Sequence, residues 1–178
     1  MHRVYTGAGD KGDTGIFGGK RVSKASPRIS AGGSVDELNS AIGLAKAFNK
    51  DRRVDLILER LQKELFYVGA DVAAEYPKKA AFVNIDMTEN LEKTIDELSE
   101  KLPPLERFIL PDGDAAASAL HLARAIARRT ERDIVALSKE EKVNQELLRY
   151  MNRISSLLFI LARLANKKAG MKEVEWRP

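Results

Sequence analysis

Residues 115–138 read AAASALHLARAIARRTERDIVALS, and this stretch decides the fold. Apolar side chains recur along it at steps of three and four residues, a spacing typical of a helix that packs one face against a core. The residues of this apolar face are Leu120, Ala123, Ala127, Ile134 and Leu137. The stretch therefore predicts one helix of a bundle.

The same spacing continues on both sides of this stretch. A second long apolar face lies within residues 141–168, at Leu147, Met151, Ile154, Leu158, Leu161 and Ala165. Three further helices are predicted upstream, over residues 35–48, 54–74 and 88–101. Ser34 or Asp36 would cap the first of these, Thr88 would open the third, and Pro103 would stop it. The predicted fold class is all-α: a five-helix bundle with a glycine-rich N-terminal loop.

Residues 1–33 differ from everything that follows. Six of the 12 glycines lie within the first 20 residues, so we expect a loop here, with at most a short strand at residues 2–5. A chain of 178 residues suggests a single domain over 1–178. We divide it into a loop region (1–33), the helical bundle (34–169) and a C-terminal tail (170–178).

Composition excludes several kinds of chemistry. The chain has no cysteine and only two histidines, His2 and His121, which rules out thiol nucleophiles, disulfides and a multi-histidine metal centre. The lack of cysteine fits a reducing compartment, so we expect a cytoplasmic location. No apolar run reaches the roughly 20 residues of a membrane span, and we expect neither a signal peptide nor a membrane partner. The net charge of +4 permits anionic ligands without indicating nucleic acid.

The glycine-rich loop reads TGAGDKGDTG over residues 6–15. Glycines allow backbone N–H groups to approach phosphate oxygens, and Lys11 and Lys24 could add positive charge. Residues 7–12 match G-x-G-x-x-G, but no strand–helix–strand unit surrounds them, so we reject a dinucleotide fold. Gly19-Lys20 is not a P-loop, because Thr14 stands where its first glycine should be. The alternative interpretation of the loop is a mobile tail.

A polar stripe on residues 115–138 gives a second signal. Its members fall within about a quarter-turn beside the apolar face when plotted at 100° per residue. They are His121, Arg124, Arg128, Glu131 and Arg132, with Arg129 further toward solvent. Several arginines with one glutamate suit a polyphosphate with a magnesium ion. The alternative is a solvated face with an Arg–Glu pair.

Other polar and aromatic residues have structural interpretations. Asn152, Ser156, Phe159 and Arg163 flank the apolar face of the last helix, and a buried asparagine there would fix register. The residues Asp36, Glu37 and Asn39 suit a helix start. By default, Phe108 is a core aromatic.

Five separated segments together resemble the PduO-type ATP:cob(I)alamin adenosyltransferases. They are YTGAGDKGDTG, RVSK, GGSVDELNSAIG, RFILPDGDAAASALHLARAIARRTER and YMNRISSLLFILARLAN, and they span nearly the whole chain. The resemblance implies a five-helix bundle that forms a homotrimer with each active site between two subunits. It implies transfer of the 5′-deoxyadenosyl group of ATP to reduced cobalamin, with release of triphosphate.

The resemblance also implies roles for individual residues. Nucleotide-binding positions of the loop are Thr6, Gly7, Ala8, Gly9, Thr14, Gly15 and Lys24. Arg128, Arg129, Thr130, Glu131 and Arg132 would contact ATP and its magnesium ion, which would lie near Glu131, and Asn152 would join them. Asp36 and Arg124 would link subunits near the corrin, and Phe108 would cover its lower face. Catalysis would rest on Arg128, Asp36, Arg124 and Phe108. Implied partners are a separate reductase and an adenosylcobalamin-dependent mutase.

Four positions depart from the family pattern. Gly7-Ala8 is smaller than usual, Ala31-Gly32-Gly33 lacks an aromatic ring, and Pro111-Asp112-Gly113 replaces a Pro-Gly-Gly turn. Ser156 replaces a carboxylate, which would loosen the subunit contact.

Two rival functions remain open from the residues alone. A di-metal carboxylate bundle needs paired Glu-x-x-His motifs, and neither histidine has a glutamate three residues before it. A nucleic-acid binder needs a broad basic face with aromatics, whereas Glu131 and Asp133 interrupt the arginines here. We therefore expect no nucleic-acid partner.

Overall fold

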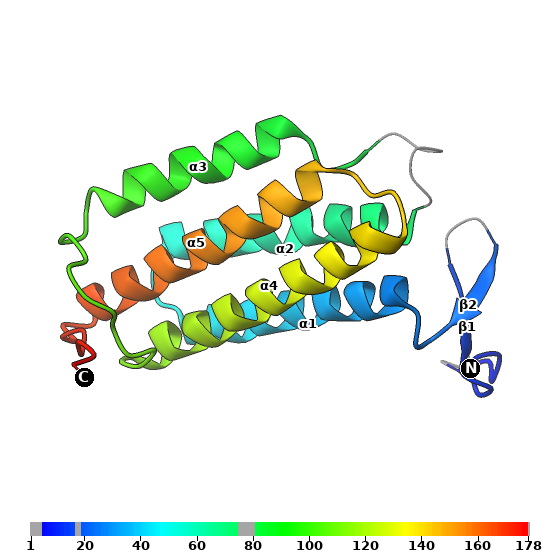
Figure 1. The fold of residues 1–178 in the computed structure, drawn as a ribbon. Coiled ribbons are helices and arrows are strands. Elements are labelled where there is room, and N and C mark those ends of the chain that lie inside the picture. The colour runs from blue at the N-terminus through cyan, green and yellow to red at the C-terminus, as the bar shows by residue number, and fades with distance from the viewer. Residues whose placement is uncertain (1–4, 17–18, 75–80, 178) are drawn as a thin grey trace.

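The computed structural model describes residues 5–16, 19–74 and 81–177. Its helices are α1 (Pro27–Phe48), α2 (Arg52–Ala73), α3 (Ile85–Ser99), α4 (Ala115–Glu140) and α5 (Glu146–Lys168). Two short strands, β1 (Asp13–Gly15) and β2 (Arg21–Ser23), precede them as an antiparallel pair. The predicted five-helix bundle is confirmed (Figure 1).

Each helix runs antiparallel to the one before it in the chain (Figure 1). Helix α1 packs against α2 and α4, α4 packs against α5, and α5 packs against α3. The bundle therefore has two distinct ends. The hairpin end carries β1 and β2 and the start of α1, while the tail end carries residues 100–114 and the C-terminus (Figure 1).

One continuous apolar core runs through the bundle, and it contains the predicted apolar faces. Leu120, Ile134, Leu147 and Leu158 are fully buried, as are Leu38 and Leu61 from α1 and α2. Burying each large aliphatic side chain contributes roughly 1.5–3 kcal/mol. This core holds α4 rigidly, which fixes the polar stripe that lies beside its apolar face.

Helix α1 begins at Pro27, well before the predicted start at residue 35. Proline suits a first helical position, because its missing N–H would have no partner there. The start was obscured by Gly32 and Gly33, which are poor helix formers. Ser34 is therefore not a cap: it lies inside the helix and its hydroxyl donates to the Ser30 carbonyl at 3.1 Å.

Two other helix starts also differ from prediction. Helix α3 starts at Ile85, because the Asn84 side chain caps it by accepting from the Met87 N–H at 3.1 Å. Thr88 is instead fully buried within the helix. Helix α5 starts at Glu146 rather than 141, after a turn in which Asn144 donates to Asp71 at 2.9 Å and to the Val83 carbonyl at 2.7 Å.

The loop region contains more structure than predicted. Arg21 in β2 donates to the Ala8 carbonyl at 2.7 Å, and the Lys24 N–H donates to the Gly12 carbonyl at 2.7 Å. These bonds fold residues 6–12 back onto the hairpin. The predicted strand at 2–5 lies almost wholly outside the described residues. None of the helices in the described ranges is long and apolar enough to cross a membrane.

Candidate active site

A cavity of about 510 Å³ lies where the hairpin meets α1 and α2. Thr14 and Gly15 of β1 line one wall, and Gly33 and Asp36 of α1 line another. A side chain at Gly33 would meet no atom within 4 Å, so the glycine leaves this wall open. The structure thus brings two predicted loop residues together with Asp36.

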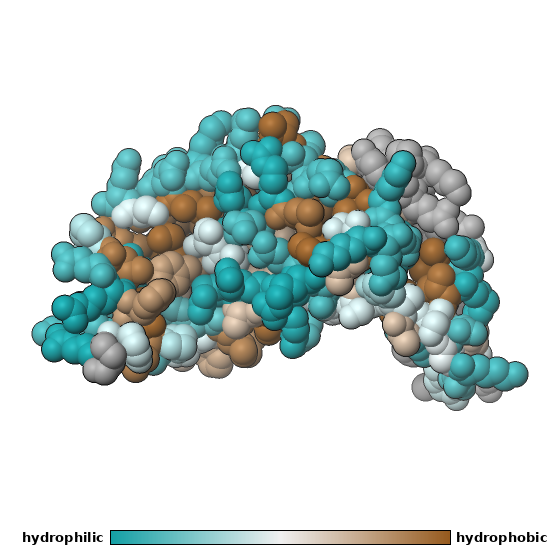
Figure 2. Space-filling model, viewed as in Figure 1, coloured by the Kyte–Doolittle hydropathy of each residue, from teal (hydrophilic) through white to brown (hydrophobic). Residues whose placement is uncertain are grey.

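The polar stripe of α4 forms a second, open hollow of about 530 Å³. Arg128, Glu131 and Arg132 line it, and Figure 2 shows hydrophilic side chains gathered over the middle of this face. Arg132 donates to the Arg128 carbonyl at 3.2 Å, and Glu131 accepts from Asn152 of α5 at 3.0 Å. Asn152 is exposed, not buried, so it orients Glu131 rather than fixing helix register.

Arg128 of the polar stripe and its neighbour Arg129 are both exposed, but they differ in their partners. Arg129 forms an ion pair with Glu37 of α1. The Arg128 guanidinium has no hydrogen bond or ion pair with any described residue. An arginine without a carboxylate partner can bind a ligand anion, so Arg128 is available to the phosphates of a nucleotide.

Thr130 belongs to the segment 128–132 that is predicted to contact ATP. Its side chain is fully buried between α4 and α1. The hydroxyl donates to the Ser34 carbonyl at 2.9 Å and approaches the Ile126 carbonyl at 3.0 Å. The side chain of Thr130 thus holds α4 against α1, and a contact with ATP through this segment stays a prediction.

A cluster of unpaired nitrogens lies toward the start of α4. His121 is 3% exposed, and neither of its ring nitrogens has a partner among the described residues. Its ring lies 6.1 Å from the Phe159 ring, and the Arg124 guanidinium lies 5.8 Å from the same ring. Burial, and then the Arg124 charge, lower the pKa of His121 below its ordinary value. Burial and nearby Arg128 also lower the pKa of Arg124.

Asp36 and Arg124 do not meet within one chain. Asp36 is exposed and lines cavities beside α2, whereas Arg124 lies over Phe159 of α5. Neither forms an ion pair with a described residue. Both partners of the predicted subunit link are therefore left unpaired.

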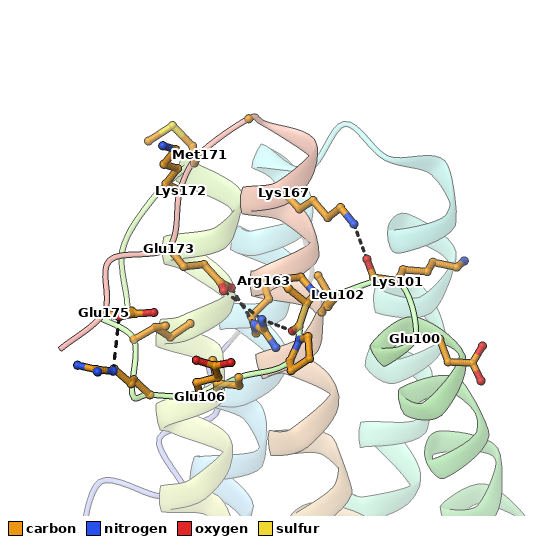
Figure 3. A pocket seen from close by; sticks show the side chains of 16 residues that line it. Glu100, Lys101, Leu102, Glu106, Arg163, Lys167, Met171, Lys172, Glu173 and Glu175 are labelled. Carbon is orange, nitrogen blue, oxygen red and sulfur yellow. Dashed lines mark hydrogen bonds and ion pairs between the residues drawn. The ribbon is translucent and has the colours of Figure 1, made fainter. Parts of the chain in front are cut away.

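Phe108 is not a core residue. Its side chain is 80% exposed, on the segment that joins α3 to α4 at the tail end. Beside it lies a cavity of about 890 Å³ between this segment, α5 and the C-terminal tail. In Figure 3, Arg163 points from α5 toward Glu173, and Lys167 reaches the Lys101 carbonyl.

The loop lies at the hairpin end of the bundle, and residues 100–114, which include Phe108, lie at the tail end (Figure 1). Helix α4 has 26 residues, which at 1.5 Å per residue is a length of about 39 Å. The polar stripe of α4 lies between these two ends. A single chain therefore does not bring all the predicted site residues into one place.

The contacts made by the C-terminal tail were hard to predict from sequence. Residues 174–176 bond to residues 108–110 through the backbone, and the only signal was a lone tryptophan, Trp176, soon after Gly170. No described group of three or more His, Asp or Glu side chains could hold a metal ion. Glu131 could supply at most one ligand, so a magnesium ion would take most of its ligands from phosphates and water.

Comparison with known proteins gives consistent matches. The family model for cobalamin adenosyltransferase matches residues 4–165. The corrinoid adenosyltransferase of Bacillus subtilis is 43% identical over 178 residues, covering 98% of this chain and 92% of that protein. The corrinoid adenosyltransferase PduO of Salmonella typhimurium is 42% identical, but this chain covers only 52% of its length.

Solved structures match over almost the whole chain. A phenylalanine-to-alanine variant of the PduO-type ATP:corrinoid adenosyltransferase from Lactobacillus reuteri, complexed with cobalamin and ATP, has a TM-score of 0.93 at 38% identity. That match covers 99% of this chain and 100% of the other. An arginine-to-lysine variant of the same enzyme, complexed with ATP, has a TM-score of 0.93 at 40% identity, covering 98% and 100%.

Proposed function

This chain belongs to the cobalamin adenosyltransferase family, and from that premise we propose how its residues carry out the reaction. The enzyme transfers the 5′-deoxyadenosyl group of ATP to the cobalt of reduced cobalamin. The observation that carries our proposal for the site is the row of cations on α4 without carboxylate partners, Arg124 and Arg128. They offer uncompensated positive charge beside Glu131.

The reaction needs no nucleophile from the protein. The electron pair of cob(I)alamin forms the cobalt–carbon bond at C5′, the C5′–oxygen bond breaks, and triphosphate leaves with that bond's electrons. The reaction therefore does not require a cysteine, and the chain has none. Holding the two substrates in line can supply on the order of 7–11 kcal/mol of the barrier.

The leaving triphosphate is held by the loop and by α4. Backbone N–H groups of residues 6–9, with Thr14 and Gly15, surround its oxygens. Lys24 lies close to Gly9, so its ammonium adds charge to the same cradle. Arg128, Arg132 and a magnesium ion near Glu131 neutralise charge that grows as the bond breaks. Asn152 orients Glu131, and Arg129 is positioned through Glu37.

A second copy of the chain completes each site. The loop lies at the hairpin end of the bundle and the segment that carries Phe108 lies at the tail end, and neither Asp36 nor Arg124 has an ion-pair partner among the described residues. In a homotrimer, Asp36 of one subunit would pair with Arg124 of the next. The same contact would bring the loop of one subunit near Phe108 of its neighbour. Ser156, exposed enough to meet a neighbour, weakens that contact relative to the carboxylate usual in the family.

Phe108 acts on the corrin. Its exposed ring covers the lower face of cobalamin and excludes the lower axial ligand, which makes cob(II)alamin easier to reduce. Nothing in the sequence resembles a flavin site, so a separate reductase supplies the electron. The product is adenosylcobalamin, which a mutase in the same cytoplasm would use.

The test is direct. The protein is mixed with ATP and chemically reduced cobalamin, and the visible spectrum and released triphosphate are recorded. The expected result is a spectrum of alkylcobalamin with stoichiometric triphosphate. No spectral change with well-folded protein would overturn the proposal, and retention of single-stranded DNA on a filter would favour the nucleic-acid alternative.

One variant tests the role of the arginine stripe. Arg128→Ala removes a cation that has no hydrogen-bond or ion-pair partner for its side chain among the described residues, so ATP affinity should fall by about tenfold or more, as expected for a charge-assisted contact. Arg53→Ala is the matched control, because Arg53 is exposed on α2 and pairs only with Glu97. Equal ATP affinity of the two variants by calorimetry would refute the assignment.

A further inference from the structure

We propose that Glu173 is a positioning residue for Phe108, and that it acts by anchoring the C-terminal tail against Arg163. The inference rests on the proposed function, in which the Phe108 ring must stay over the lower face of the corrin. An exposed ring has few packing contacts to hold it. Its position is therefore set by its backbone, and the tail is what fixes that backbone.

The anchor is an ion pair between a buried arginine and a partly exposed glutamate. Arg163 of α5 is 5% exposed, and its Nε donates to Glu173 Oε1 at 2.8 Å while Nη2 donates to Glu173 Oε2 at 3.1 Å. The same Nη2 donates to the Pro103 carbonyl at 2.9 Å (Figure 3). Arg163 thus ties α5, the α3–α4 segment and the tail together, and a two-pronged charged contact of this kind is geometrically specific.

From this anchor the tail bonds to the backbone at Phe108 itself and at the second residue after it. The Leu110 N–H donates to the Val174 carbonyl at 2.8 Å, and the Trp176 N–H donates to the Phe108 carbonyl at 2.8 Å. Between them, Ile109 and Glu175 form an antiparallel bridge. The alternation of an antiparallel pair places successive side chains on opposite faces, so these bonds also set the direction of the Phe108 ring.

The other end of the segment is held by the next turn of α5. Asn166 donates to the Asp112 carbonyl at 3.0 Å and accepts from the Asp114 N–H at 2.9 Å. Gly113, between these bonds, has φ of 114° and is in contact with Asn166, so no side chain fits there. Asn166 therefore fixes the start of α4, which leaves the tail as the element that fixes Phe108 itself.

The structure provides a matched pair of tail carboxylates. Glu173→Gln keeps the shape but removes the charge that pairs with buried Arg163. Glu175→Gln removes a carboxylate of the same tail whose partners, Arg107 and Arg177, are exposed. Both variants are assayed from cob(II)alamin with a reducing system and from chemically reduced cob(I)alamin, with ATP affinity measured beside them.

Glu173→Gln should slow the cob(II)alamin route by about tenfold, the size expected when a contacting network is disturbed, and should leave the cob(I)alamin route and ATP affinity nearly unchanged. Glu175→Gln should behave as the wild type in both. Trp176 is the only tryptophan, so its emission also reports the tail directly: it should shift to longer wavelength in Glu173→Gln alone. Equal behaviour of the two variants would overturn the inference, as would an equal loss on both routes.

A second variant decides the matter if Glu173→Gln does not fold. Trp176→Pro lies outside all the helices and removes the N–H that bonds to Phe108 together with the indole ring, so Trp176→Ala, which loses the ring and keeps the N–H, is assayed beside it. Trp176→Pro should show the same selective loss on the cob(II)alamin route, and wild-type rates on both routes would refute the role of the tail. Failure of the wild-type protein itself to alkylate cob(I)alamin would instead count against the proposed function.

Discussion

At the scale of single residues, the exposure of Phe108 distinguishes a role in core packing from a role in contacting a ligand. A fully buried ring costs about 3–5 kcal/mol when truncated to alanine, whereas an exposed one costs far less. Because Phe108 is 80% exposed, Phe108→Ala should lower the free energy of unfolding by only about 1 kcal/mol or less. Urea unfolding measures this, with fully buried Leu120→Ala as the control that should lose about 2–5 kcal/mol.

The same variant should lose function selectively. Adenosylation from cob(II)alamin should collapse, ATP binding should survive, and chemically reduced cob(I)alamin should restore part of the rate, since cob(I)alamin lacks the lower ligand. A variant that melts far below the wild type, or that fails equally in both assays, would argue against this role for Phe108.

His121 gives a prediction about pH. Burial lowers the pKa of this imidazole below its ordinary value of 6.5 in the folded protein, while the opposing pull of Asp112 and Glu173 is smaller. The unfolded chain therefore binds a proton that the folded chain does not, and stability must fall as the pH drops below about 6.5. At higher pH both states are neutral and no stability is lost.

The measurement is the free energy of unfolding in urea across this window. His121→Leu removes the titrating group, so its stability should change less between pH 7.5 and pH 5.5 than that of the wild type. His2, the other histidine, is kept in both proteins and serves as the internal control. Parallel curves for the two proteins would show that His121 is not the group responsible.

At the scale of elements, the loop and the hairpin are the least anchored part of the described structure. Residues 6–12 are held by turn bonds such as Asp10 N–H to Gly7 at 3.2 Å, and by Arg21. We expect their amides to exchange quickly without ligand and to become protected with magnesium ATP, because phosphate oxygens would accept from them. Hydrogen exchange measures this, with amides of α5 as the unchanged control. Unchanged loop exchange at saturating ATP would contradict the cradle.

The start of helix α1 is held in place by bonds to two other helices, and it forms one wall of the loop cavity. Its first turns are held by Arg28, which is buried and donates to the Ala74 carbonyl at 2.7 Å and pairs with Glu141 at 2.5 Å. These bonds tie the start of α1 to the ends of α2 and α4. Gly33 and Asp36 are consequently fixed beside the hairpin, so the loop cavity has one rigid wall and one wall that ligand can order.

At the scale of the whole molecule, the two unpaired partners Asp36 and Arg124 predict an assembly. Asp36→Arg and Arg124→Asp should each weaken the proposed homotrimer, because a charge left alone in a desolvated contact costs roughly 3–5 kcal/mol. The double variant should recover part of the loss. Sedimentation velocity measures the oligomer directly.

The matched control is a pair on the same two helices. Glu37 and Arg129 form an exposed ion pair within one chain, so Glu37→Gln should leave assembly unchanged. Single variants of Asp36 and Arg124 that remain fully active trimers would refute the subunit link.

The sequence alone determined the number of helices and their buried faces. The helical period of 3.6 residues predicted that Leu120, Ile134 and Leu158 are buried, and this period depends only on backbone geometry. The stripe containing Arg128 and Glu131 followed from the same period. Helix starts were harder to predict, since Gly32 and Gly33 weaken the local signal while Ala31 and Val35 pack against the core.

Only the tertiary structure decided what each polar or aromatic side chain faces. Thr130 and Arg128 lie two residues apart on one helix, yet the side chain of the first is buried against α1 and that of the second has no partner in the part of the chain that the structure describes. Phe108 is 80% exposed, and its carbonyl accepts from a tail residue more than 60 positions later in the chain. Such contacts join residues distant in sequence, so no local spacing encodes them; packing of the whole chain does.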